Sequence, residues 1–346
     1  CQYDHEVQAG SVLKPLQGRG RVNADASVLR PVLNSQKGII LSLGIAPSYS
    51  EIDAYHMAAS AIDTAVRSAV AAGADIDYLA LLDNFCWCSS NEPERLFQLK
   101  RAAEACYDYA VAYGTPFISG KDSMFNDFKG YDANGDAIKI SVPPTLLISS
   151  IGVVPDVRKT VSLDLKRAGD LLYVLGETHD ELGGSEYAAA CAEENNNNND
   201  NDGVFVGGEV PQVNAVKNKK MYRAFHVATR KGLVASAVSV GKGGLAVALL
   251  RTAMAGKLGL DISLKNLPGD FSGDTSALFS ESQGRIVASI APARRKEFER
   301  VMKGNAIARL GAVTSKETVL VRGMKKRLTL PLKDALTAYR STFKNF

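Results

Sequence analysis

Short apolar runs alternate with helix-length amphipathic segments along the first half of the chain. Residues 39–43, 78–82 and 115–119 have the length and apolar character of buried strands. Two segments between them, 53–72 and 93–113, place apolar residues at helical spacing, and a glycine follows each one. This alternation predicts a domain in which helices pack against a sheet.

The second half repeats the mixed pattern with its own elements. Residues 171–175, 285–290 and 308–321 are predicted strands, and 213–231 is the longest predicted helix of this half. Because 346 residues are about twice the usual domain size, we expect two domains that meet near residue 157. We divide the chain into a linker segment (1–30), an N-terminal domain (31–156), a C-terminal domain (157–330) with an asparagine-rich loop insertion near 195–203, and a C-terminal helix (331–346).

The composition narrows the class of protein. A net charge of +4, from 41 basic and 37 acidic residues, is too small to indicate a nucleic-acid partner. No apolar stretch reaches the ~18 residues of a membrane span, so we expect no membrane partner. Five cysteines in so long a chain do not make a disulfide framework. They indicate reduced thiols and therefore a cytoplasmic protein.

Two polar segments that follow predicted strands are candidate ligand sites. Residues 120–123, Gly-Lys-Asp-Ser, combine a glycine that lets a phosphate approach the backbone with a lysine that supplies countercharge. The upstream glycine of a Walker A loop is absent, and a tight turn with a solvated lysine explains the segment equally well. Asp83 at a strand end suits a metal or nucleotide site, or else it caps a turn or helix.

Two further features have both an ordinary and a functional explanation. Asp63 and Arg67 lie four residues apart on the first predicted helix, which favours an ion pair worth roughly a few tenths of a kcal/mol. Residues 241–244, Gly-Lys-Gly-Gly, precede a predicted helix and either hold an anion or make a tight turn. The local sequence assembles no hydrolase triad or His/Cys metal motif.

Seven short motifs occur in one order along the chain, and together they resemble one family. They are YDHEVQ (3–8), LKPL (13–16), DNFCW (83–87), FISGKDS (117–123), GGSEY (183–187), GGLAVAL (243–249) and FSES (279–282). This order closely resembles the C-terminal half of formylglycinamide ribonucleotide amidotransferase, also called phosphoribosylformylglycinamidine synthase. The resemblance runs from about residue 3 to residue 339.

The resemblance implies a fold and a reaction. The family carries two tandem copies of a PurM-like module similar to aminoimidazole ribonucleotide synthetase, and this chain resembles the second copy. Such a module is α+β, with an N-terminal domain whose sheet pairs across a dimer or pseudo-dimer and a C-terminal layered α/β domain. The family is a ligase of de novo purine biosynthesis. ATP phosphorylates the formyl amide oxygen of formylglycinamide ribonucleotide, and ammonia from a glutaminase domain or subunit then displaces phosphate.

The family's nucleotide and substrate contacts correspond to particular residues here. Asp83, Gly120 and Lys121 are implied contacts of ATP or ADP, and Ser123 is an implied substrate contact. The family's catalytic histidine lies in the first copy, so His5 is not that residue and no catalytic residue is assigned. We therefore expect this half to be inactive alone.

The implied magnesium site departs from the family pattern. Asp25 and Asp63 correspond to magnesium ligands, but Arg67 and Ser239 stand at the other two ligand positions. Magnesium prefers near-octahedral oxygen coordination, so a cation and a hydroxyl at these positions weaken the site. We hypothesise that this half binds a phosphate-bearing ligand with little or no Mg²⁺, basic side chains such as Lys121 supplying the positive charge.

The resemblance also implies partners. A lone copy exposes the pairing edge of its N-terminal sheet, which is an aggregation liability. We therefore expect the first synthetase-like half as a partner, or a homodimer when this half is isolated. The alternative function is a non-catalytic, nucleotide- or phosphate-binding structural half that stabilises the assembly.

Overall fold

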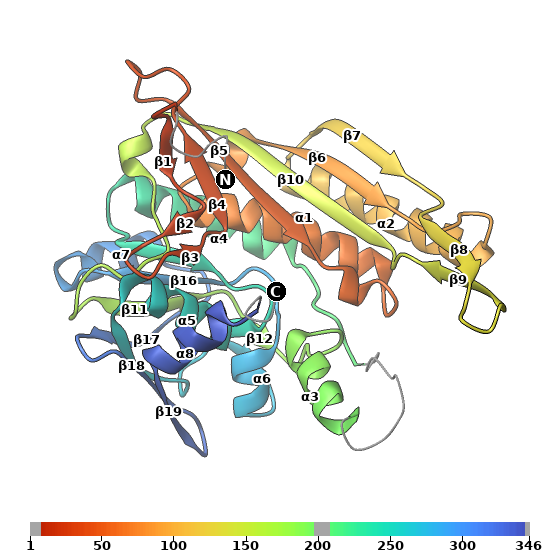
Figure 1. Ribbon diagram of the computed structural model, residues 1–346. Helices are drawn as coiled ribbons and strands as arrows, with labels where there is room; N and C mark the ends of the chain where they lie inside the picture. The colour runs from red at the N-terminus through yellow and green to blue at the C-terminus, as the bar shows by residue number, and fades with distance from the viewer. Residues whose placement is uncertain (1–7, 197–207, 343–346) are drawn as a thin grey trace.

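The computed structural model describes residues 8–196 and 208–342, and most of its strands belong to two sheets (Figure 1). The N-terminal sheet has six strands in the order β1-β4-β5-β10-β6-β7. Only β6 and β7 are parallel; the other neighbours in this sheet are antiparallel. The strands are β1 (Ser11–Leu13), β4 (Ala26–Leu29), β5 (Gly38–Ile45), β6 (Leu79–Cys86), β7 (Phe117–Ser123) and β10 (Thr145–Val154).

Helices α1 (Ala54–Ala71) and α2 (Pro93–Tyr113) cover one face of this sheet (Figure 1). Asp53 caps α1, because its carboxylate accepts the N–H of His56 at 3.0 Å. A Cβ at Gly44 would lie 1.9 Å from the carbonyl oxygen of Ala61. The glycine therefore allows α1 to lie directly against β5.

The opposite face of the N-terminal sheet, called the outer face below, carries exposed apolar side chains. Leu41, Leu43 and Ile45 of β5 and Ile151 and Val153 of β10 each expose between 37% and 57% of their surface. Contiguous exposed apolar side chains on a folded domain are typical of interaction surfaces.

The C-terminal sheet is the middle layer of an α/β domain. Its order is β13-β16-β11-β17-β14-β18-β19. Alternate residues of β11 enter two cores: Tyr173 and Leu175 pack with α4 and α7, and Leu172 and Val174 pack with α5 and α8. The strands are β11 (Leu171–Leu175), β13 (Ser236–Ser239), β14 (Gly259–Ser263), β16 (Ile286–Ile290), β17 (Ile307–Thr314), β18 (Thr318–Arg322) and β19 (Arg327–Pro331). The helices are α3 (Glu186–Asn196), α4 (Ala215–Arg230), α5 (Gly244–Gly256), α6 (Asp274–Phe279), α7 (Arg295–Val301) and α8 (Leu332–Arg340).

Short paired strands and single turns of helix connect these elements. The small pairs are β2 (Leu16–Gln17) with β3 (Val22–Asn23), β8 (Asp127–Tyr131) with β9 (Ala137–Ser141), and β12 (Thr178–His179) with β15 (Gly269–Asp270). Short 3₁₀ helices lie at Pro47–Tyr49, Ile76–Tyr78, Val157–Lys159 and Pro292–Arg294.

Several elements differ from the sequence-based expectations. No strand was predicted where the β8–β9 hairpin lies, and part of the predicted linker 1–30 supplies β1 and β4 to the N-terminal sheet. The single strand predicted over 308–321 is two strands, β17 and β18, joined by a turn. Exposed hairpins and short edge strands bury too little to produce an apolar pattern, so the sequence gives no signal for them.

One predicted feature lies mostly outside the described residues. Of the asparagine-rich insertion expected near 195–203, residues 195–196 end α3, and 197–203 are among the residues that the structure does not describe. Within 8–196 and 208–342, no helix combines the length and the apolar character needed to cross a membrane.

Candidate functional site

Asp83 and Gly120 lie side by side on neighbouring parallel strands, in register with each other. Both strands continue further than predicted, so Asp83 lies within β6 and residues 120–123 form the end of β7 instead of a loop. Because β7 is at the free edge of the sheet, residues 120–123 pair with β6 and still remain accessible to water. A Cβ at Gly120 would lie 2.1 Å from Oδ1 of Asp83. A larger residue at this position would displace the carboxylate from its place beside β7.

The Asp83 carboxylate has an unused acceptor. Its Oδ1 is buried and has no hydrogen-bond partner in the described part of the chain. Burial raises the pKa of Asp83, the nearby Asp122 carboxylate adds to the rise, and the backbone N–H of Lys121 opposes it. A buried polar atom normally has a partner, and a ligand hydroxyl or amino group would supply one here. Contact of Asp83 with a nucleotide stays a prediction.

Lys121 and Ser123 lie on the other side of the same strand. Side chains alternate along β7, and cross-strand neighbours run from Lys121 through Asn84 and Leu147 to Ile45 of the outer face. Asp83 and Gly120 belong to the face that the helices cover. A single ligand can contact all four predicted residues only by passing around the free edge of β7.

Asp63 and Arg67 of α1 form the centre of a buried polar cluster, called the Asp63–Arg67 cluster below. Both side chains are fully buried, whereas the sequence favoured an ordinary ion pair of small value. The Arg67 guanidinium donates to Oδ2 of Asp63. Four neutral donors complete the carboxylate's contacts: the hydroxyls of Tyr113 (2.5 Å) and Tyr222 (2.6 Å), the side-chain amide of Asn218 (3.1 Å) and the backbone N–H of Gly284 (2.9 Å).

Arg67 connects Asp63 to the C-terminal domain. Its Nε donates to Oγ of Ser239 at 2.8 Å, and its Nη1 donates to Oε1 of Gln283 at 2.7 Å. The backbone N–H of Ser239 donates in turn to Oδ2 of Asp25 at 2.9 Å. The four positions implied as magnesium ligands thus belong to one hydrogen-bonded chain. Burial alone lowers the pKa of Arg67, but attraction to the Asp63 carboxylate outweighs it and the pKa lies above its ordinary value.

This arrangement does not fit a magnesium ion. Both oxygens of Asp63 accept from protein donors, and Arg251 pairs with Oδ1 of Asp25 at 2.7 Å. Within the described ranges, 8–196 and 208–342, no group of three His, Cys, Asp or Glu side chains could hold a metal ion. The Arg67 guanidinium already supplies positive charge beside Asp63. Magnesium ligation by Asp25 and Asp63 stays a prediction, and these contacts are a physical reason to expect weak binding.

The glycine-rich turn before α5 is held by contacts within the protein. Gly243 and Gly244 have φ of +75° and +65°, the left-handed region that favours glycine. The N–H of Gly243 donates to Oε1 of Glu281 at 2.7 Å, and Nζ of Lys242 lies 3.0 Å from Oε1 of Glu186. An anion at this turn would compete with both carboxylates. The contacts therefore favour the tight-turn explanation of residues 241–244.

The sequence did not predict the buried residues that join the two domains around Glu281 and Asp63. Glu281 accepts the N–H of Glu186 at 3.0 Å and the hydroxyl of Tyr49, and burial raises its pKa. Its only sequence signal was its place in the FSES motif. The neutral donors to Asp63 gave no local signal, because the side-chain donors lie 50 or more residues from it along the chain.

Comparison with known sequences places both domains in one family. Residues 23–152 match the N-terminal domain of AIR synthase related proteins, and residues 167–322 match their C-terminal domain. The PurL subunit of phosphoribosylformylglycinamidine synthase from Methanocaldococcus jannaschii is 32% identical over 337 residues, which are 94% of this chain and 43% of that protein. The Deinococcus radiodurans subunit is 31% identical over 350 residues, 99% of this chain and 43% of that protein. The chain thus spans about two fifths of the length of these curated relatives.

Solved structures give the same fold. Thermotoga maritima PurL complexed with FGAR superposes with a TM-score of 0.71 at 19% identity, over 93% of this chain and 49% of that one. The structure of PurLQS from the same organism gives 0.63 at 18% identity, over 92% and 47%. At these identities the likeness establishes the fold alone. With both domain descriptions matched and PurL subunits as its relatives, the chain belongs to the AIR synthase related family, as a PurL-type member with the PurM-like fold.

Proposed function

We propose that this chain supplies half of a cytoplasmic ligase of purine biosynthesis. The whole enzyme would convert formylglycinamide ribonucleotide, ATP and glutamine-derived ammonia to formylglycinamidine ribonucleotide. The observation that carries the proposal is the unpartnered Oδ1 of Asp83 beside Gly120. PurL relatives support the reaction, and the T. maritima PurL structures with FGAR and with ADP support the ligands.

The residues at the free edge of the N-terminal sheet take the binding roles. Asp83 accepts a hydrogen bond from the nucleotide, and Gly120 leaves space for it. Lys121 adds positive charge for phosphate, and Ser123 contacts the substrate on the outer face. No residue of this chain is assigned a catalytic role, because the site is completed by the first synthetase-like half.

The outer face supports pairing with that first half. Leu43 and Val153 are each 57% exposed there, and a partner sheet would remove both from water. When the first half is absent, a second copy of this chain covers the outer face and gives a two-fold homodimer. The ammonia comes from a separate glutaminase, a role supported by the relative solved as PurLQS.

ADP release tests the half-enzyme. The chain is mixed with ATP, Mg²⁺, formylglycinamide ribonucleotide and ammonium, with and without a purified first half. We expect turnover only in the mixture, and a roughly tenfold or greater loss with Asp83→Asn, as for one hydrogen bond to a charged group. The control is Asp77→Asn, which changes an exposed aspartate paired with Arg223. Turnover by this chain alone would show that one copy makes a complete site.

A second candidate is a non-catalytic structural half. The Asp63–Arg67 cluster favours it, because the residues implied as a metal site are used there to join the two domains. On this account Asp83→Asn leaves the turnover of the mixed halves unchanged. Arg67→Met instead lowers that turnover, because it destabilises the junction between the two domains of this chain, which a melting curve measures.

A further inference from the structure

An open groove lies between the two domains, beside the start of α4. Its volume is about 930 Å³, near the upper end of the range of about 300–1,000 Å³ for small-ligand sites. Helices α1 and α2 contribute one wall, and residues within 177–181, 209–217 and 270–272 of the C-terminal domain contribute the other. None of the residues proposed above to contact nucleotide or substrate lines this groove.

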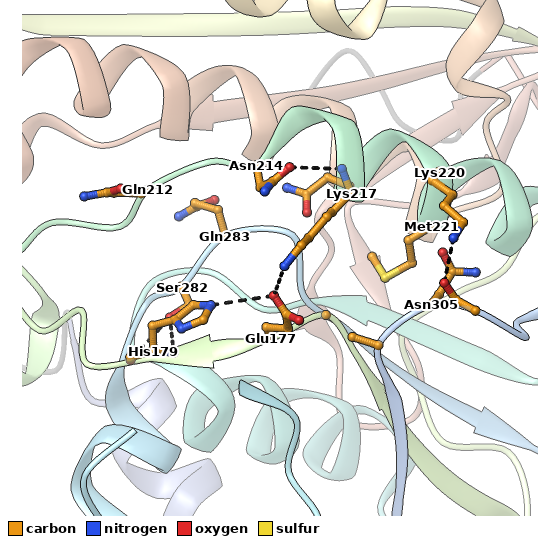
Figure 2. A pocket seen from close by; sticks show the side chains of 14 residues that line it. Glu177, His179, Gln212, Asn214, Lys217, Lys220, Met221, Ser282, Gln283 and Asn305 are labelled. Carbon is orange, nitrogen blue, oxygen red and sulfur yellow. Dashed lines mark hydrogen bonds and ion pairs between the residues drawn. The ribbon is translucent and has the colours of Figure 1, made fainter. Parts of the chain in front are cut away.

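The groove has an excess of negative charge. Its described lining residues include six carboxylates and a single lysine, Lys217. The carboxylates are Asp108, Glu177, Asp180, Glu181, Glu209 and Asp270. Nζ of Lys217 lies 2.9 Å from Oε2 of Glu177, and Nε2 of His179 lies 3.9 Å from the same oxygen (Figure 2). This lysine is therefore paired already, and the charge of the other five carboxylates is not offset within the lining.

Neutral donors hold two of these carboxylates in position. Oδ2 of Asp108 accepts the hydroxyl of Tyr55 at 2.7 Å, and Oδ1 of Asp180 accepts the backbone N–H and the hydroxyl of Ser272, each at 3.0 Å. Hydrogen bonds from the Ser276 hydroxyl and the Ser272 N–H lower the pKa of Asp180, which keeps it ionised at neutral pH. These contacts orient the carboxylates and leave their charge available to a cation.

Glu181 is a buried carboxylate with an unused acceptor. Its side chain is 6% exposed, and Oε1 accepts the backbone N–H of Gln212 at 2.8 Å. Oε2 is buried and has no hydrogen-bond partner in the described part of the chain. The guanidinium of Arg285 is buried in the same domain, but it donates to the hydroxyl of Thr178 and to two backbone carbonyls. Because a buried carboxylate oxygen normally has a donor, an ammonium group that enters the groove would supply it.

The groove also offers apolar surface. The ring of Tyr109 and the side chains of Val213, Val216 and Phe271 line it. No group of three His, Cys, Asp or Glu in the described ranges could hold a metal ion, so the carboxylates are too widely spread for a single small cation. Carboxylates that share a groove with apolar side chains suit a flexible aliphatic chain carrying several ammonium groups.

We propose that this groove binds an aliphatic polyamine. One ammonium group donates to Glu181, others lie at exposed carboxylates such as Glu209 and Asp270, and the methylene groups contact Tyr109 and Phe271. The site is separate from the edge of β6 and β7 and does not depend on the proposed ligase function. Glu181→Gln keeps the acceptor for Gln212 and removes an unpaired buried charge, so the variant is expected to fold. Circular dichroism and melting curves verify this.

Calorimetric titration of the full chain with spermidine at low ionic strength tests the proposal. We expect saturable binding whose Kd rises at least about tenfold in Glu181→Gln, as for one hydrogen bond between charged groups. The double variant Glu209→Gln and Asp270→Asn should raise the Kd about threefold or more, because exposed ion pairs contribute less. The matched control is the double variant Glu94→Gln and Asp334→Asn, which makes the same changes at exposed positions outside the groove. It should leave the Kd unchanged.

Four outcomes would overturn the proposal. They are absence of saturation at millimolar spermidine, an equal loss in the control variant, competition by Mg²⁺ at the concentration of spermidine, and tighter binding of tetralysine than of spermidine. The first refutes the site, the second and third show a diffuse effect of negative charge, and the fourth assigns the groove to a basic polypeptide. A Kd that is unchanged in Asp83→Asn supports the groove, even if the proposed ligase function fails, whereas a loss there places the ligand at the sheet edge.

Discussion

Replacing Arg67 by methionine removes the charge that balances Asp63 while keeping most of the side-chain length. The Asp63 carboxylate would remain fully buried with only its four neutral donors. Removing one partner of a buried ion pair costs about 3–5 kcal/mol, because an uncompensated charge stays in the interior. The neutral donors retain part of the stabilisation, so we expect a loss of about 3 kcal/mol in the free energy of unfolding.

A matched pair on the surface isolates the effect of burial. Lys100 and Glu104 of α2 have the same four-residue spacing, but their side chains are 72% and 39% exposed. Lys100→Met should cost less than about 0.5 kcal/mol, because exposed pairs of this spacing contribute little. The double variant Asp63→Asn and Arg67→Met should recover part of the loss, since the buried charge is then absent.

Urea unfolding followed by circular dichroism measures all four proteins. A loss in Arg67→Met no greater than in Lys100→Met would refute the argument that burial makes this pair strong. Magnesium supplies a second readout. Because the cluster does not fit the ion, millimolar Mg²⁺ should leave the melting temperature of the unliganded wild-type protein unchanged, and a clear rise would show that a metal binds after all.

Three further predictions concern the sheet. Gly44→Ala places a Cβ against the backbone of α1 and should cost about 1–3 kcal/mol in urea unfolding, whereas Gly241→Ala, with no heavy atom within 4 Å, should cost less. Burial raises the pKa of Asp83 in the folded protein. The protonated carboxyl group therefore stabilises the fold fully below the unfolded pKa of about 3.9, and this stabilisation is lost as the pH rises through the folded pKa. Asp83→Asn should remove this loss, and an identical dependence of unfolding free energy on pH in the two proteins would contradict the argument. Leu43→Glu on the outer face should lower the mass measured by light scattering to that of a monomer, whereas Val216→Glu, at an 80% exposed position on α4, should not.

The elements that bury one face were predictable from the sequence. β5 and α1 followed from an apolar run and a helical period, and the Asp53 cap fixed where α1 begins. The two-domain order followed as well, and the PurM-like fold came from the ordered motifs. Each of these signals is local, so one stretch of sequence contains it.

The site was predictable only in part. The register of β6 and β7 places Asp83 beside Gly120. The sequence did not predict that both residues lie within paired strands, because an edge strand such as β7 has no apolar pattern over its polar end. The spacing of Asp63 and Arg67 suggested a weak pair, because spacing carries no information about burial. Burial came from residues far away in sequence, such as Tyr222 on α4.

The hydrophobic core beneath α1 includes residues from both domains, and the rings of Tyr113 and Tyr222 stack across it with centroids 6.3 Å apart. Cutting the chain near residue 157 would leave Tyr113, Asp63 and Arg67 facing water in one fragment, and Tyr222 in the other. Neither sheet is then an independent cooperative unit. We therefore expect the chain to melt as a single unit with one calorimetric peak, because the core that joins its two domains forms within the chain itself.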